Sequence, residues 1–472
     1  MSPAARAWRR SSAPAGGPRR PRVSRAAPAR TPAPPTANLP LPTPARPPRP
    51  NPAAPWADPH HRTTRPGGPP VPEREPAFMH RTSPDWERHA ARMADATVRP
   101  ESRWHRPLAT TARHLFVPRW WTWTHSEREG RWAYELHDGP SAPEAWMNSA
   151  YDRHTTLTTR VGRHHADHAT PGTLIPETRP TSSSTLPRLV VEMYRHAVIA
   201  DDSRTLVTCG SGYGTALACR RLGADRVTSV DVDPYLVQAA RERLDAIGHR
   251  PRLEVCDVTG ELPGSFDRIV STVSVETIPA SWLTALAPGG RLVTTLARTG
   301  LVIVADKTAD GGATGQVAPE AAAFMSTRHG DDYPPGPDNT VLWTTARTAE
   351  GDSVTTGRYP VMRVNDAWDV RSTLELMVPG VEHRMDDSPG GARTAYMLHP
   401  DGSWARAAAA GPRDLPTVHQ GGPRRLWDEL DKIRTWLVID GDLPVAGAAV
   451  TIDPDGTCHL NRSGWTATIG AR

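Results

Sequence analysis

The chain has 472 residues, of which 50 are proline, four are phenylalanine and 38% are hydrophobic, which excludes one continuous core over the whole length. Residues 1–78 hold 22 of the prolines, and their 13 arginines against three acidic residues give a net charge of +10. Since the whole chain carries +5, the other residues sum to −5. Residues 1–78 also contain only five Leu, Ile, Val or Phe residues. This is too little apolar surface to offset the entropy of folding, and we predict a disordered Pro/Arg-rich tail over 1–78.

This tail leaves two interpretations open. A basic arm can bind nucleic acid or act as a targeting peptide, although it lacks the apolar stretch of a secretory signal. The alternative is an extension without function, with the true start at Met79 or Met93. Arginine outnumbers lysine 54 to two, which is typical of a G+C-rich gene. We favour the second interpretation and expect no nucleic-acid partner.

Hydropathy and cysteine content indicate the compartment. No apolar run approaches the roughly 20 residues that cross a bilayer, so we expect no membrane partner and a soluble, cytoplasmic protein. The four cysteines show no metal-ligand or disulfide spacing, and three of them fall in apolar runs, which predicts reduced thiols. They are Cys209, Cys219, Cys256 and Cys458.

The first element after the tail is a tryptophan-rich stretch. Its aromatic residues have no clean period, and Trp120, Trp121 and Trp123 crowd together between Arg, Thr and His. Crowded aromatic side chains can stack on nucleobases or form a packed cap, and we favour the cap. The prediction is a small irregular cap subdomain over 79–180 with one short helix at 105–114.

Two groups of basic residues in this cap subdomain invite a functional interpretation. His164 and His168, four residues apart, could ligate zinc from one helix face, but no carboxylate or Cys partner has suitable spacing. We predict a solvated loop there, which includes His165, and no metal site. Arg153 and Arg160 could attract an acidic peptide, but exposed arginine is too common in this chain to assign either.

From 186 to 296 apolar strands alternate with helices through short connections, within a core domain that we place at 181–325. This pattern predicts a mainly parallel, doubly wound α/β sheet with its ligand at the carboxyl ends of the strands. The expected strands are 205–209, 226–231, 252–256, 267–272 and 291–295. The expected helices are 189–198, 215–222, 234–247 and 281–286.

The pattern after this core is weaker. We expect strands at 302–304 and 315–317, a loop over 328–340 and only weak strand alternation over 341–410. A helix with apolar residues at helical spacing begins at Pro423. Two apolar runs flank an Asp-Pro-Asp-Gly turn at 453–456, which predicts a hairpin. We therefore predict an α+β extension over 326–472.

The sharpest motif is Gly210-Ser211-Gly212, which follows an apolar strand. Glycines lack a Cβ and let the backbone approach a ligand closely. Asp231 ends the next strand, 21 residues after Gly210, where a carboxylate can accept both hydroxyls of a ribose. On their own these residues fit a nicotinamide dinucleotide, S-adenosyl-L-methionine or a plain turn.

Three further details favour S-adenosyl-L-methionine. Thr215 stands where a dinucleotide fingerprint needs Gly or Ala. Asp257 ends the third strand, where its side chain can accept the adenine amino group. The strand at 267–272 leads into Pro288-Gly289-Gly290, in the order usual for Rossmann-like methyltransferases. We therefore expect the cofactor to be bound by Gly210, Ser211, Gly212, Asp231, Val232, Asp257 and Val258.

These motifs together resemble the protein-L-isoaspartate O-methyltransferase family over residues 105–325. The resemblance rests on 114–119 (HLFVPR), 150–152 (AYD), 157–158 (LT), 181–187 (TSSSTLP), the glycine motif, Asp267 with Ile278-Pro279, and Pro288-Gly289-Gly290. It implies a Rossmann-like fold, S-adenosyl-L-methionine as cofactor and methylation of a carboxylate. It also implies that the loop 183–185 holds the accepting carboxylate, with Ser183 and Thr185 as catalytic residues. Hydroxyl residues in front of a helix can equally serve as N-caps.

The C-terminal extension resembles that of family members that modify ribosomally made peptides, in residues 420–428 and in the final hairpin. In those relatives an aspartate side chain is methylated, and a neighbouring backbone nitrogen displaces the ester to give a succinimide and often isoaspartate. The resemblance implies an acidic or Asp-containing precursor peptide or protein as the substrate. The alternative within the family is repair of isoaspartate.

The implied reaction asks little of the protein. A carboxylate is already ionised at neutral pH and the sulfonium is an activated electrophile, so alignment of the reactants supplies the rate without a base or a metal. One residue departs from the family pattern, because Thr208, two residues before Gly210, replaces the usual Asp or Glu near the methionine ammonium group. This departure leaves a third interpretation open, a catalytically inactive module that binds nucleic acid or a protein partner.

Overall fold

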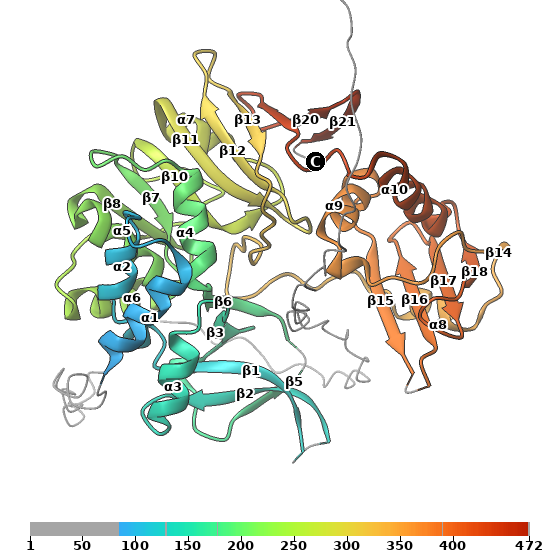
Figure 1. The fold of residues 1–472 in the computed structure, drawn as a ribbon, viewed down its shortest axis with the longest axis horizontal. Coiled ribbons are helices and arrows are strands. Elements are labelled where there is room, and N and C mark those ends of the chain that lie inside the picture. Colours follow the sequence, from blue (N-terminus) through green and yellow to red (C-terminus); the bar gives the residue numbers. More distant parts are fainter. Residues whose placement is uncertain (1–84, 128–129, 177, 389, 471–472) are drawn as a thin grey trace, which may run out of the picture. The chain divides into compact units, whose positions relative to one another are not determined.

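The computed structural model describes residues 85–470 except 128, 129, 177 and 389, so the predicted tail over 1–78 lies outside the described residues. Within this part of the chain the strands form three sheets, on which the helices pack (Figure 1). No helix of these residues is long and apolar enough to span a bilayer.

The first sheet is antiparallel and lies in the cap subdomain, except for a strand at 180–184 that crosses the boundary predicted at 180. Across the sheet its strands are β4 (His164–His165), β3 (Leu157–Val161), β1 (Arg119–Ser126), β2 (Arg131–Asp138) and β5 (Leu174–Pro176), and β6 (Pro180–Ser184) also pairs with β3. The helices of this segment are α1 (Trp86–Thr97), α2 (His105–Thr110) and α3 (Pro143–Ala150), with a 3-10 turn at Arg113–Phe116.

The expectation of an irregular cap subdomain was wrong, and two neighbouring tryptophans give the reason. Trp120 packs into one hydrophobic cluster and Trp121 into another, where they are 5% and 2% exposed. Because both faces of β1 bury aromatic side chains, the strand lacks the alternation of apolar and polar residues that marks a half-buried strand. The helix expected at 105–114 ends at Thr110.

The central sheet has ten strands. From its parallel edge they are β9 (Arg252–Val255), β8 (Val227–Asp231), β7 (Thr205–Thr208), β10 (Phe266–Val275), β11 (Leu286–Leu296), β12 (Val302–Lys307), β13 (Ala313–Val317), β19 (Ala449–Ile452), β20 (Cys458–Arg462) and β21 (Trp465–Ile469). The five strands from β9 to β11 are parallel, which confirms the predicted doubly wound α/β fold. The strand order reverses between β7 and β10, and ligands of such sheets bind at the carboxyl ends beside this point.

Both faces of the parallel strands are buried. Neighbouring residues of a strand point to opposite faces, and Leu206 and Val207 belong to different hydrophobic clusters, as do Ile269 and Val270. Burial on both faces explains why these strands are near-continuous apolar runs in the sequence. The helices before and between them are α4 (Pro187–His196), α5 (Tyr213–Leu222), α6 (Pro234–Ala246) and α7 (Ala280–Ala285).

The third sheet is antiparallel and lies in the extension. Its strands are β14 (Ser353–Thr356), β18 (Thr417–Gly421), β17 (Trp404–Ala409), β16 (Arg393–Leu398) and β15 (Glu382–Asp387), and its helices are α8 (Thr340–Thr348), α9 (Trp368–Met377) and α10 (Leu426–Asp440). The core-facing residues of β17 are Ala405, Ala407 and Ala409. Alanine is depleted in strands, so the sequence between 341 and 410 showed only weak alternation.

The last three strands of the chain return to the central sheet. β19 pairs with β13, and β19 and β20 form the predicted hairpin around the turn at 453–456. Strands from both sides of the boundary predicted at 326 therefore share one sheet (Figure 1).

Candidate functional site

The glycine motif forms a tight turn between β7 and α5. Gly210 and Gly212 have φ angles of +51° and +88°, which L side chains rarely adopt. A Cβ at Gly212 would lie 2.9 Å from Cβ of Ala240 on α6, and a Cβ at Gly210 would lie 3.1 Å from the carbonyl oxygen of Ser183. The turn therefore requires glycine, and the backbone of Ser183 lies directly beside it.

Asp231, at the end of β8, holds the same turn in place. Its carboxylate accepts the backbone N–H groups of Gly210 and Asp233, both at 3.0 Å. Burial raises the pKa of Asp231, while these two hydrogen bonds act in the opposite direction. Each carboxylate oxygen has two acceptor sites, so the side chain can also accept two ribose hydroxyls. Of the neighbouring predicted residues, Ser211 is buried and Val232 is half-buried.

Asp257, two residues after β9, already has protein partners. One carboxylate oxygen accepts from the backbone N–H and the hydroxyl of Thr259, and the other lies 2.6 Å from Nδ1 of His329. Burial acts to raise the pKa of Asp257, but the hydrogen bonds from His329 and Thr259 outweigh it, so the pKa is lowered. Val258 packs its side chain into the core. No local pattern pointed to His329, which lies 72 residues further along the chain.

Thr208 has a structural role in the sheet. Its hydroxyl lies 2.7 Å from the hydroxyl of Thr272 and accepts the backbone N–H of Thr272 at 2.9 Å. The residue therefore joins β7 to β10 at the point where the strand order reverses. It offers no charge to the ammonium group of a cofactor.

The predicted acceptor loop 183–185 is only partly a loop, because Ser183 and Ser184 are the last residues of β6 and Thr185 begins the short connection to α4. Ser183 and Thr185 are half-buried, and among the described residues neither hydroxyl has a hydrogen-bond partner. The hydroxyl of Ser184 between them is buried without a partner. The N-cap of α4 is Leu186, and no side chain caps the helix, so the alternative interpretation of these residues as N-caps was wrong. The hydroxyls of Ser183 and Thr185 are available to a ligand.

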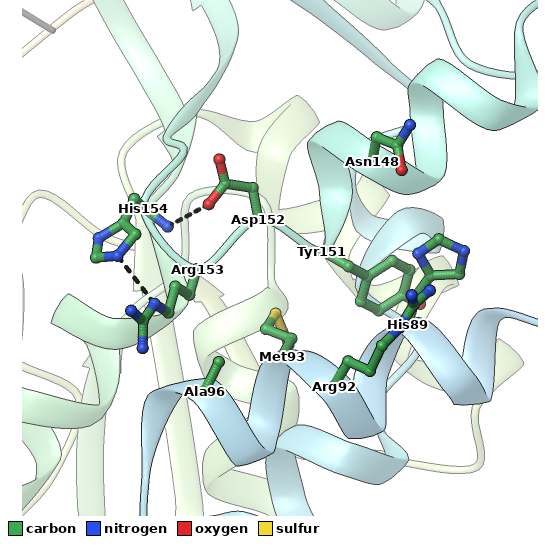
Figure 2. A pocket seen from close by; sticks show the side chains of 9 residues that line it. All are labelled: His89, Arg92, Met93, Ala96, Asn148, Tyr151, Asp152, Arg153 and His154. Carbon is green, nitrogen blue, oxygen red and sulfur yellow. Dashed lines mark hydrogen bonds between the residues drawn. The ribbon is translucent and has the colours of Figure 1, made fainter. Parts of the chain in front are cut away.

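Arg113 fixes this acceptor loop and was missed in the sequence. Its side chain is fully buried and donates to the carbonyl oxygens of Ser184 and Thr185, both at 3.2 Å. The same guanidinium group donates to the carbonyl of Ala150 at the end of α3 and to those of Asp152 and Thr155 in the segment after it, part of which is drawn in Figure 2. Burial lowers the pKa of Arg113 to about 10, so it is charged at neutral pH. The sequence contains 54 arginines, and no local motif distinguishes Arg113 from the others.

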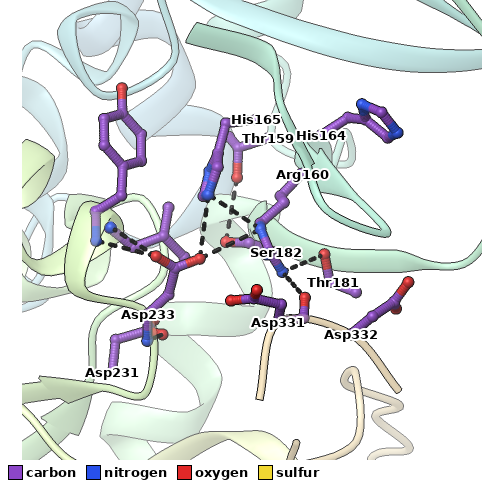
Figure 3. A network of polar contacts seen from close by, with 12 residues as sticks. Thr159, Arg160, His164, His165, Thr181, Ser182, Asp231, Asp233, Asp331 and Asp332 are labelled. Atoms are coloured by element: carbon purple, nitrogen blue, oxygen red, sulfur yellow. Dashed lines mark hydrogen bonds and ion pairs between the residues drawn. The ribbon is translucent and has the colours of Figure 1, made fainter. Parts of the chain in front are cut away.

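A buried ion-pair network connects the cap subdomain with the start of α6 (Figure 3). Asp233 is the N-cap of α6 and accepts two backbone N–H groups of its first turn. Its second carboxylate oxygen lies within 3.3 Å of the side chains of Arg160, His165 and Arg328. Burial acts to raise the pKa of Asp233, but these partners lower it far below its usual range. The network therefore holds a permanent carboxylate beside Asp231.

The network also corrects the interpretation of the histidine run. The predicted solvated loop was wrong, because His164 and His165 form β4 and a 3-10 turn follows at Ala166–His168. The side chain of His165 is 11% exposed and pairs with Asp233, whereas those of His164 and His168 are exposed. Arg160 is occupied by the same carboxylate, so it is not free to attract a peptide. Among the residues that the structure describes, no cluster of three His, Cys, Asp or Glu side chains could hold a metal ion.

The strand order, the glycine turn and the acceptors at the carboxyl ends of β8 and β9 define the class of protein. Asp231 can bind ribose hydroxyls, and Asp257 keeps acceptor capacity for an adenine amino group beside its contact with His329. These groups fit S-adenosyl-L-methionine, and they place the chain among the Rossmann-like methyltransferases.

Comparison with known proteins narrows this class to a family. Residues 175–327 match the family model of protein-L-isoaspartate(D-aspartate) O-methyltransferase (PCMT). A protein-L-isoaspartate O-methyltransferase of Nitrobacter winogradskyi is 35% identical over 113 residues, which are 23% of this chain and 50% of that protein. The chain therefore carries a protein-L-isoaspartate O-methyltransferase-like domain, which confirms the resemblance of the motifs that lie within residues 175–327.

The other comparisons cover a smaller share of the matched protein or show a lower sequence identity. A ribosomal protein L11 methyltransferase of Pelobacter propionicus is 40% identical over 90 residues, which are 18% of this chain and 29% of that protein. The chain thus spans half or less of these curated relatives. A solved protein-L-isoaspartate O-methyltransferase aligns with a TM-score of 0.41 and 15% identity, over 82% of this chain and all of that chain.

Proposed function

We propose that this protein is a carboxyl methyltransferase that uses S-adenosyl-L-methionine to methylate aspartyl or isoaspartyl side chains of a peptide or protein. One contact carries the proposal. The loop with the free hydroxyls of Ser183 and Thr185 lies against the glycine turn, where the carbonyl oxygen of Ser183 is 3.1 Å from the position of a Cβ on Gly210. An acceptor on this loop and a cofactor on that turn would be neighbours.

The side chains of this site have separate tasks. When bound, S-adenosyl-L-methionine supplies an electrophilic methyl group. The accepting carboxylate has a pKa of about 4 and is ionised at neutral pH, so the protein need not remove a proton. The hydroxyls of Ser183 and Thr185 donate hydrogen bonds to this carboxylate, while Arg113 keeps their loop in position. Asp231 and Asp257 orient the cofactor, and the rate arises from the mutual alignment of the two reactants.

The substrate that we favour is an Asp-containing precursor peptide made by the ribosome and modified in the cytoplasm. The support is the extension over 326–472, which resembles that of the peptide-modifying members of the family. In the product, the backbone nitrogen of the next residue attacks the ester carbonyl. A C–N bond forms, the nitrogen loses its proton and methanol leaves, which gives a succinimide.

Repair of isoaspartate is the second candidate, and the name of the matched Nitrobacter relative favours it. Intact-mass analysis after incubation with cofactor distinguishes the two, with an isoaspartyl peptide and an Asp-containing precursor from a neighbouring gene as substrates. Maturation predicts the mass of one added methyl group, or the loss of one water after ring closure, on the precursor alone. Repair predicts methylation of the isoaspartyl peptide.

A third outcome would overturn both candidates. If no peptide is methylated, and the protein binds nucleic acid in a salt-sensitive way that disappears when residues 1–78 are removed, the protein is a binding module without turnover.

A further inference from the structure

A cavity of about 310 Å³ lies between α1 and the segment that follows α3 (Figure 2). This volume is at the lower end of the range for ligand sites. None of the residues predicted to bind the cofactor lines it. The lining residues are His89, Arg92, Met93, Ala96, Asn148, Tyr151, Asp152, Arg153 and His154.

The cavity has an apolar base and a basic rim. Met93 and Tyr151 are 3% and 7% exposed and form the base. His89, Arg92, Met93 and Ala96 recur at spacings of three and four residues, so they share one face of α1. The cavity can therefore hold the stem of a side chain on apolar surface while its polar end meets the rim.

The rim carries a net positive charge. Among the described residues, neither Arg92 nor Arg153 makes an ion pair with a carboxylate, although Arg153 donates to the imidazole of His154 at 2.9 Å. Asp152 is already occupied, because its two carboxylate oxygens accept from the backbone N–H of His154 and from the hydroxyl of Thr155. Burial and the neighbouring Arg92 lower the pKa of His89, which keeps its ring neutral at pH 7. The cavity lining therefore carries two guanidinium groups and one carboxylate, which already has hydrogen-bond partners.

The cavity is physically joined to the acceptor loop. The carbonyl oxygens of Asp152 and Thr185 both lie within 3.4 Å of terminal nitrogens of Arg113. The backbone N–H of Leu186 also donates to the hydroxyl of Thr156, which follows the cavity segment. Because both carbonyl oxygens bind the same guanidinium group, they are less than about 10 Å apart. An extended peptide of three residues covers this distance.

We propose that this cavity binds a carboxylate side chain of the peptide substrate, close in sequence to the residue that is methylated, and that Arg92 and Arg153 are the side chains that select it. The proposal rests on the proposed function, since it assigns a second contact of the same peptide. It names the substrate class more closely: a peptide with an acidic residue within a few positions of the acceptor aspartate.

The test uses two labelled synthetic peptides that differ only in a glutamate or a glutamine about three residues from the acceptor position. In both, asparagine replaces the acceptor aspartate, so binding is measured by fluorescence anisotropy without turnover. The wild-type protein should bind the glutamate peptide roughly tenfold more tightly than the glutamine peptide. The protein with Arg92→Gln and Arg153→Gln together should bind both peptides equally, with unchanged calorimetric binding of S-adenosyl-L-homocysteine.

Arg99→Gln is the matched control, because Arg99 is exposed just beyond α1 and does not line the cavity. Equal binding of the two peptides by the wild type, or a preference for glutamate that persists in the double variant, would overturn the proposal. A loss of preference in Arg99→Gln of the same size would overturn it as well. Parallel assays with the acceptor aspartate restored keep the outcomes apart: absence of methyl transfer contradicts the proposed function, whereas the anisotropy result decides on the cavity.

Discussion

Replacing Asp231 with alanine is the most direct perturbation of the cofactor site. The carboxylate holds the glycine turn through the N–H groups of Gly210 and Asp233, and we expect it to accept two ribose hydroxyls as well. A hydrogen bond to a charged group contributes about 1.5–3 kcal/mol, so the loss of two costs about 3–6 kcal/mol of binding free energy. This loss corresponds to roughly 10²- to 10⁴-fold weaker binding of the cofactor.

The same substitution removes an acceptor from within the protein. Two buried or half-buried N–H groups then lose their acceptor, and we expect the free energy of unfolding to fall by about 1–3 kcal/mol. Calorimetric titration with S-adenosyl-L-homocysteine, together with thermal unfolding of the same samples, separates the loss of binding from the loss of stability. Asp231→Asn keeps one acceptor oxygen and should show an intermediate affinity.

The exposed Asp225, which lies just after α5, offers a control, because Asp225→Asn changes the charge equally without touching the site. The assignment of Asp231 to the cofactor is refuted if the folded Asp231→Ala protein binds S-adenosyl-L-homocysteine within about threefold of the wild type. Equal losses in Asp231→Ala and Asp225→Asn would show a general effect of charge and contradict it in the same way.

Three further predictions concern the framework around the site. Arg113→Met should reduce kcat/KM for methyl transfer by at least about tenfold, because the acceptor loop loses the hydrogen bonds that position it, while calorimetric binding of the cofactor stays unchanged. Arg113→Lys keeps the charge but loses the planar guanidinium fork, so it should show the same defect if Arg113 acts by positioning the loop and not by supporting folding. Burial lowers the pKa of His114 from 6.5 to about 4, so the unfolded chain takes up the proton at a higher pH than the folded protein does. The free energy of unfolding should therefore fall by about 3 kcal/mol as the pH drops from 6.5 to 4. Thermal unfolding should show that this contribution is absent in His114→Gln. Burial also lowers the pKa of His383 to about 4, so the His114→Gln protein should still lose a similar amount of stability over the same pH range because of His383. Thr208→Val should destabilise the protein by about 1–2 kcal/mol in denaturant unfolding, because the N–H of Thr272 loses its acceptor, whereas Thr208→Ser should not.

The glycine turn and the position of Asp231 beside it could be predicted from sequence because their signals are local. Gly210 and Gly212 are glycine since the backbone there has positive φ, and Asp231 is placed by the strand that it ends. The parallel strands were equally visible, because burial on both faces gives short apolar runs. These constraints act within a few residues, so the sequence around each position records them.

The groups that complete the site act across the chain and leave no local record. Arg113 donates to carbonyls up to 72 residues away. Every residue has a backbone carbonyl, so the residues that accept these hydrogen bonds show no particular side chain in the sequence. Asp233 could be recognised as the N-cap of α6, yet its partners Arg160 and Arg328 come from opposite sides of the core sequence. The same limit hid the cap sheet, since the side chains that cover the second face of β1 are distant in sequence.

The long-range contacts of the site include residues that lie just beyond the end of the family match. The match ends at residue 327, and the next two residues, Arg328 and His329, reach back to Asp233 and Asp257 at the carboxyl edge of the sheet. Their segment is held further by the bond from Arg160 to the carbonyl of Asp331. The start of the extension is therefore part of the candidate cofactor site. Because Asp257 is the acceptor proposed for adenine and His329 already occupies one of its oxygens, residues outside the family core can set how tightly the cofactor is held. The extension thus contributes residues to the candidate cofactor site.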